Sequence, residues 1–172
     1  VAAIQARWDE ASSHLAVAQE LASSAGDDEA IQARWLEAYL RGGKGDISGA
    51  LTAAQEALRM AREAGIPELE ADCLRLLGGL QRQKSAWDEA QTALQQSLEV
   101  SRQQGDMYRQ GQATSELGQV HEQRGLAFAH DSAAWAGQAV GAYHSAVALF
   151  QKLGAAYDLQ LAQTALERVA GT

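Results

Sequence analysis

Small and apolar residues recur in one pattern four times along this 172-residue chain. In the segments 8–26, 47–65, 87–105 and 136–154 they follow at steps of four, three and three, and a glycine comes five residues later. The positions are filled by Ala11, Leu15, Ala18, Leu21 and Gly26; by Ala50, Ala54, Ala57, Met60 and Gly65; by Ala90, Leu94, Ser97, Val100 and Gly105; and by Ala139, Tyr143, Ala146, Leu149 and Gly154. Such steps form one stripe of an α-helix, and the glycine suits a left-handed cap. The pattern therefore predicts four helices with equivalent contact faces.

Another helix precedes each of the last three segments, so the helices come in pairs. The residues that share one face are Trp35, Ala38 and Tyr39 in 29–40, Leu74, Leu77 and Gly78 in 68–83, and Thr114, Leu117 and Gly118 in 108–123. The chain has a single proline and few β-branched residues, and we find no convincing alternation of apolar and polar residues. These features predict an all-helical chain.

The helix pairs resemble tetratricopeptide repeats. That family has an apolar residue, Leu-Gly three and four residues later, and an Ala thirteen after the Leu, followed by an apolar residue and another Ala. Leu74, Leu77, Gly78, Ala90, Leu94 and Ser97 fit this pattern, with Ser97 in place of the last Ala. The units are near forty residues long. They resemble the long-unit variety found in kinesin light chains, cell-polarity adaptors, and the arrays of bacterial signalling ATPases and transcription activators.

The resemblance implies an all-α superhelix in which about eight helices stack as a solenoid. Three complete pairs are expected, with a half-unit at each end. The expected units are a lone second helix at 8–26, repeats at 27–65, 66–105 and 106–154, and a lone first helix at 155–172. Because both ends are half-units, we expect residues 1–172 to be one array from a larger protein.

Charge and composition limit the classes of partner. The net charge of −8 argues against a nucleic acid, which is bound by clustered Lys and Arg. No apolar run reaches the ~18 residues that cross a bilayer, so we expect no membrane partner. The lone Cys73 cannot form a disulfide within the chain and favours a reducing, cytoplasmic location.

Sequence motifs for catalysis are incomplete. The stretch 42–46, GGKGD, lacks the spacing and the Ser/Thr of a phosphate-binding loop, and HEQRG at 121–125 lacks the second His of a metalloprotease helix. The four histidines show no metal-ligand spacing as a set. We expect neither an enzyme nor a cofactor or metal site.

The concave surface is the first candidate site, since the resemblance implies that first helices line it. The implied inward residues are Ala33, Leu36 and Leu40 in the first repeat, Asp72, Arg75, Gly79 and Arg82 in the second, and Gln112, Ser115, Gln119 and Glu122 in the third. Family members that hold C-terminal carboxylates use Lys and Asn at these places, and that set is absent here. Arg75 and Arg82 either bind a carboxylate of a partner or pair with Asp72 and neighbouring glutamates.

An insertion is the second candidate site. Leu77 and Ala90 are thirteen residues apart, whereas Leu117 and Ala139 are twenty-two apart, so about nine extra residues lie within 125–137. Insertions in repeat arrays often lie on a binding face. The apolar residues of this region are Leu126, Phe128 and Trp135. The insertion is either a partner contact or a longer helix pair whose extra turns pack on each other.

The function that these features favour is a protein-interaction scaffold that binds a peptide or a partner domain through the groove or the insertion. Two other classes remain open. One is a small-molecule sensor of a bacterial signalling ATPase or transcription activator, with a closed pocket near Trp135 and Tyr143. The other is a structural spacer. Self-association through exposed terminal helices is a further expectation.

Overall fold

The computed structural model describes residues 26–171, which form seven α-helices and one short 3₁₀ turn. The predicted helix at 8–26 lies, except for Gly26, outside the described residues. The helices are α2 (Asp27–Gly43), α3 (Ile47–Ala64), α4 (Pro67–Gln83), α5 (Trp87–Gln103), α6 (Met107–Ala127), α7 (Ser132–Leu153) and α8 (Ala156–Ala170), with the turn η1 (Ala129–Asp131) before α7. No strand occurs in the described part of the chain.

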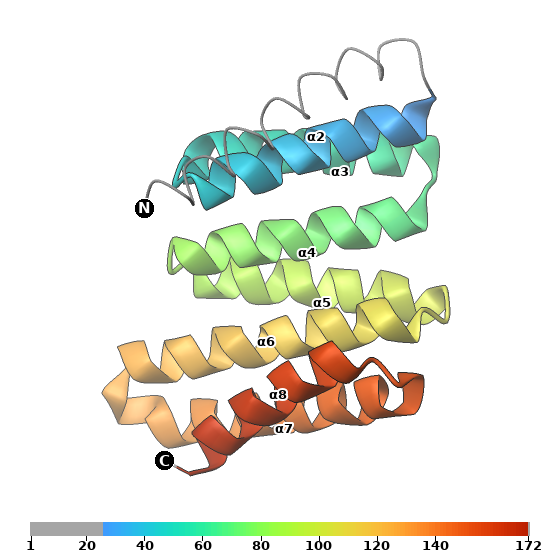
Figure 1. The fold of residues 1–172 in the computed structure, drawn as a ribbon. Coiled ribbons are helices and arrows are strands. Elements are labelled where there is room, and N and C mark those ends of the chain that lie inside the picture. The colour runs from blue at the N-terminus through green and yellow to red at the C-terminus, as the bar shows by residue number, and fades with distance from the viewer. Residues whose placement is uncertain (1–25, 172) are drawn as a thin grey trace, which may run out of the picture.

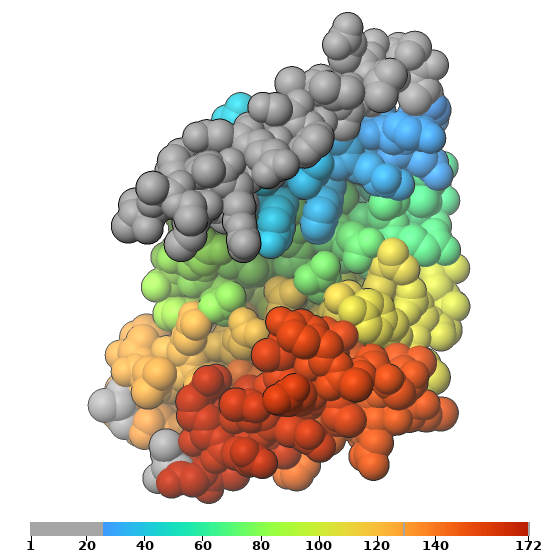
Figure 2. All heavy atoms as spheres, in the orientation of Figure 1, coloured from blue at the N-terminus to red at the C-terminus, as the bar shows by residue number. Residues whose placement is uncertain are grey.

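The helices stack as consecutive antiparallel pairs, and each pair rests on the next (Figure 1). The first helices α2, α4, α6 and α8 form one layer, and the second helices α3, α5 and α7 form the other. The space-filling view shows the pairs following one another in chain order from α2 to α8 (Figure 2). This arrangement confirms the predicted all-α solenoid.

Short side chains at the repeated positions allow the two helices of a pair to come close together. Ala50, Ala90 and Ala139 are completely buried, as are Leu94 and Tyr143 one turn later. A Cβ placed on the first-helix glycine opposite would collide with these residues, because it would lie 2.5 Å from Leu94 Cγ at Gly78 and 2.7 Å from Tyr143 Cε1 at Gly118. The Leu-Gly pattern therefore marks a close contact within each of these pairs.

Glycines and aspartates set the turns between helices. Gly65, Gly105 and Gly154 have φ of 67–68°, the left-handed conformation that the pattern predicts. Gly26 differs, because its φ is −77° and it stands as the residue before α2. At the helix starts, the side chains of Asp46 and Asp106 accept hydrogen bonds from backbone NH groups three residues later, both at 2.9 Å.

The last helix leaves large side chains uncovered. In α8, Tyr157 is 73% exposed and Leu161 is 53% exposed. Self-association through the terminal helices stays a prediction.

None of the helices between residues 26 and 171 combines the length and the apolar character that crossing a membrane requires.

Candidate functional site

Two hollows join into one groove along the first helices. The hollow at the α2–α4 end has a volume of about 360 Å³, and the one at the α6–α8 end has a volume of about 600 Å³. Both are lined by Arg75, Glu116 and Gln119, so these residues stand where the hollows meet. The groove is therefore continuous across the described repeats.

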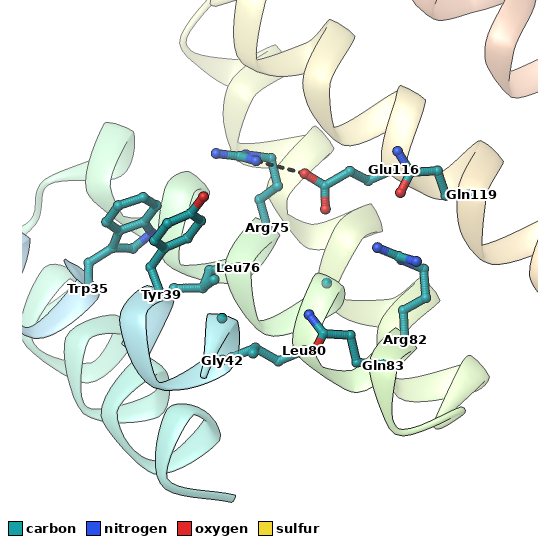
Figure 3. Close-up of a pocket in the computed structure, with 12 residues that line it drawn as sticks. Trp35, Tyr39, Gly42, Arg75, Leu76, Leu80, Arg82, Gln83, Glu116 and Gln119 are labelled. Carbon is teal, nitrogen blue, oxygen red and sulfur yellow. Dashed lines mark hydrogen bonds and ion pairs between the residues drawn. The ribbon is translucent and has the colours of Figure 1, made fainter. Parts of the chain in front are cut away.

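An aromatic pair forms the α2 side of the smaller hollow (Figure 3). The rings of Trp35 and Tyr39 stack with centroids 5.6 Å apart and an interplanar angle of 9°. Trp35 is half-buried, and its Nε1 donates a hydrogen bond of 3.2 Å to the backbone oxygen of Asp72. Tyr39 is 50% exposed, so it offers apolar ring surface to the groove.

The inward positions of α2 differ from those expected. Ala33 and Leu40 are buried between helices and Leu36 does not line the hollow, whereas Trp35, Tyr39 and Gly42 do. The expected inward positions of α2 lie one residue too far along the chain. The cause is Glu37, which is only 9% exposed and stands forty residues before Leu77, where the repeat pattern has an apolar residue.

Ion pairs explain how a glutamate occupies that buried position. Arg34 Nη1 and Arg41 Nη2 lie 2.7 and 2.8 Å from the two carboxylate oxygens of Glu37. A buried carboxylate is tolerated when charged groups satisfy both oxygens. Counting forty residues from Gly78 and Gly79 would have identified the correct register, with Ala38 and Tyr39 as their counterparts.

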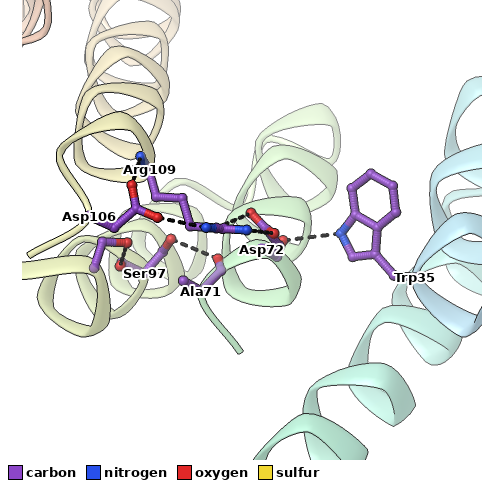
Figure 4. A network of polar contacts seen from close by, with 7 residues as sticks. Trp35, Ala71, Asp72, Ser97, Asp106 and Arg109 are labelled. Carbon is purple, nitrogen blue, oxygen red and sulfur yellow. Dashed lines mark hydrogen bonds and ion pairs between the residues drawn. The ribbon is translucent and has the colours of Figure 1, made fainter. Parts of the chain in front are cut away.

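Asp72 is a structural residue that does not line either hollow. Arg109 of α6 donates to both of its carboxylate oxygens, from Nε at 3.1 Å and from Nη2 at 2.9 Å (Figure 4). Arg109 also lies 2.6 Å from Asp106. The hydrogen bonds to the two aspartates raise the pKa of the Arg109 guanidinium, and the bond to Asp72 has the largest effect. Together with the bond from Trp35, Asp72 connects α2, α4 and α6.

The two predicted arginines of α4 both line the smaller hollow, but their surroundings differ. Arg75 Nη1 lies 2.7 Å from Glu116 Oε1, so the charge of Arg75 is compensated within the protein. Arg82 forms no ion pair with any residue in the described part of the chain. The Nε of each arginine is buried and lacks a hydrogen-bond partner.

Polar residues of α6 line the larger hollow, as the resemblance implied. Gln112, Ser115, Gln119 and Glu122 all contribute to it. Glu122 accepts hydrogen bonds from Tyr143 at 2.8 Å and from Arg168 at 2.7 and 2.8 Å. Burial and the bond to Glu122 raise the pKa of Tyr143. The sequence reasoning missed Glu116 and Arg168, whose roles depend on contacts between repeats.

The inserted residues lengthen a helix pair. Relative to the 17 residues of both α4 and α5, α6 has 21 and α7 has 22. The ring of Trp135 stacks on His121 with centroids 5.7 Å apart, and the Arg124 guanidinium lies 4.2 Å from its centroid. The extra turns thus pack on each other, which is one of the two alternatives that the sequence left open.

The three predicted residues of the insertion lie in different surroundings. Trp135 is half-buried between α6 and α7. Phe128 is 41% exposed and meets the edge of His130. Leu126 is 81% exposed and lines the larger hollow. Only Leu126 therefore extends the groove.

The described residues place these features in a helical-repeat protein, an all-α solenoid with a concave groove. Among solved structures, the chain is similar to the crystal structure of BtubC (BKLC) from P. vanneervenii, with a TM-score of 0.66 and 17% sequence identity. The match covers 98% of this chain and 74% of that chain. No family model and no curated protein matches the sequence. At 17% identity this likeness shows the fold alone, which is the all-α solenoid described above.

Proposed function

We propose that the chain is a protein-interaction scaffold that holds an extended segment of a partner protein in the concave groove. The observation that carries the proposal is the continuity of the two hollows across α2, α4, α6 and α8. An extended segment exposes its backbone NH and C=O groups to whatever lines its path. The glutamines, Ser115 and Thr164 that line the groove can donate to and accept from those groups.

The groove favours a segment over a small metabolite. The sensor alternative expects a closed pocket near Trp135 and Tyr143. Tyr143 lines the larger hollow, whereas Trp135 does not and instead packs between α6 and α7. Both hollows open to solvent along the same face, which suits a ligand that continues beyond either of them.

The test is a selection of peptides from a phage-displayed library of random sequences, made on the intact chain and on two variants. Gln119→Trp places a bulky, uncharged side chain where the hollows meet. Gln95→Trp makes the same change at an exposed position of α5 that lines neither hollow. We expect the intact chain and Gln95→Trp to enrich the same peptides and Gln119→Trp to lose them.

Folding of all three proteins is compared by circular dichroism before selection. Equal enrichment on Gln119→Trp would place binding outside the groove. The absence of any enriched peptide on the folded intact chain would refute the proposal and leave the spacer or the sensor. A thermal-shift screen of metabolites would separate those two, because a bound metabolite raises the unfolding temperature.

A further inference from the structure

The smaller hollow has a recess in its floor at Gly79. Tyr39 stands forty residues before Gly79 and Gln119 forty residues after it, so the neighbouring first helices carry large side chains at the same place in the repeat. Among the described residues outside the α4 backbone, a Cβ built on Gly79 would have one atom within 4 Å, Glu116 Oε2 at 3.5 Å. The missing side chain thus leaves space in the middle of α4, between Arg75 and Arg82 (Figure 3).

The charges around this recess do not cancel. Its charged lining residues are Arg75, Arg82 and Glu116, and Glu116 is already paired with Arg75 at 2.7 Å. Arg82 is half-buried, has an unsatisfied Nε, and forms no ion pair with another described residue. Among the residues that the structure describes, one positive charge in the groove is therefore uncompensated, in a chain with a net charge of −8.

The larger hollow offers no comparable cation. Its arginines are Arg75, which pairs with Glu116, and Arg168, which pairs with Glu122 at 2.7 Å. Of the arginines that line the groove in residues 26–171, Arg82 is the one without a carboxylate partner. Arg82 is therefore the place in the groove where we expect an anionic group of a partner to bind.

We propose that the recess over Gly79 receives the side chain of an Asp or Glu from the bound segment, and that Arg82 binds its carboxylate. A guanidinium presents a planar fork of donors that matches a carboxylate. Tyr39 and Leu76 line the same hollow and can contact the methylene groups of that side chain. A doubly charged phosphate fits less well, because Glu116 is also in the hollow and would repel its second charge.

This inference rests on the proposed function and adds to it the residue type that the scaffold selects. The test uses two phage-displayed libraries of twelve-residue peptides, random except for a central residue that is Glu in one and Gln in the other. Both are selected in one mixture, and the ratio of Glu to Gln members is measured by sequencing. On the intact chain we expect Glu members to be enriched by about tenfold, as for a charged hydrogen bond.

Three variants connect that ratio to the recess. Arg82→Gln removes the charge without leaving a protein carboxylate unpaired, and it should bring the ratio close to one. Arg82→Lys keeps the charge and should preserve part of the preference. Arg102→Gln makes the matched change at an exposed position of α5 outside both hollows and should leave the ratio unchanged.

The outcomes separate this inference from the proposed function. Peptides that need Gln119 but show the same Glu to Gln ratio on the intact chain and on Arg82→Gln would overturn the inference and leave the groove as a binding site. No enrichment from either library would overturn both. Enriched peptides are then synthesised with amidated C-termini, and loss of binding on amidation would overturn the inference by showing that a terminal carboxylate is bound instead.

Discussion

Two adjacent glycines of α4 face different surroundings and make a matched pair of substitutions. Gly78 faces α5, where a new Cβ would lie 2.5 Å from Leu94 Cγ and 3.2 Å from the backbone oxygen of Ala90. Gly79 faces the groove, where the nearest atom is Glu116 Oε2 at 3.5 Å, an ordinary contact. Alanine at either position gains the same helix propensity, so the difference between the variants isolates the steric effect.

At Gly78, the higher helix propensity of alanine and the steric clash of its Cβ change the free energy of unfolding in opposite directions. Replacing a helical glycine by alanine favours the helix by ~1 kcal/mol, and Gly79→Ala should raise the free energy of unfolding by up to that amount. Leu94 is completely buried and cannot move away from a new methyl group without displacing its neighbours. Overpacking of this kind costs ~1–3 kcal/mol, so Gly78→Ala should be less stable than Gly79→Ala by ~1–3 kcal/mol.

Urea unfolding followed by circular dichroism and by tryptophan fluorescence measures this difference. Repeat arrays can lose two-state behaviour, so the two signals must give coincident transitions for the free energies to be compared. The urea dependence should be the same in both variants. If Gly78→Ala stabilises the protein as much as Gly79→Ala does, the close contact between α4 and α5 is refuted.

Three further predictions test other parts of the structure. Ala90→Leu introduces three heavy atoms at a completely buried helix contact and should lower the free energy of unfolding by ~1–3 kcal/mol; unchanged urea unfolding would refute the repeat register. Burial, followed by the charges of Asp72 and Glu70, raises the pKa of Cys73 to about 12. A disulfide reagent at pH 8 should therefore label this thiol at the rate of unfolding rather than at the rate of a free thiol. Rapid labelling of the folded chain would contradict the burial of Cys73. Burial and Arg124 lower the pKa of His121 below 6.5, so the unfolded chain binds a proton that the folded chain refuses as the pH falls through that value. Stability should therefore fall between pH 7 and 5.5, by at most ~1.4 kcal/mol per pH unit from this group, and His121→Gln should show a flatter profile; parallel profiles would exclude His121 as the cause.

The sequence predicted the fold well because its pattern records contacts within a helix pair. Ala90, Leu94 and Gly78 are close both in the repeat and in space, and each position admits only small or apolar residues. The register of α2 was mispredicted because Glu37 replaces an apolar residue and is stabilised by arginines one turn away on either side. A pattern of apolar positions cannot anticipate such a substitution.

The groove was predicted less completely, because its polar residues are arranged by contacts between repeats. Arg75 and Arg82 have similar places on α4, and the sequence gives no sign that Glu116 compensates one and leaves the other. Asp72 has the spacing of a groove residue, yet Arg109, 37 residues later in the next helix pair, binds its carboxylate. Pairings of this kind depend on how far successive repeats rotate, which the repeat pattern does not encode.

The position of Asp72 has a mechanical consequence for the array. Through its backbone oxygen and its carboxylate it joins three successive first helices along the concave side. A solenoid of stacked pairs behaves like a spring whose curvature changes when neighbouring units rotate against each other. Such a connection resists extension at the inner radius, so pulling the chain from its ends should open α2, α4 and α6 together as one elastic unit. The length of the groove would then be set by the protein before a partner binds.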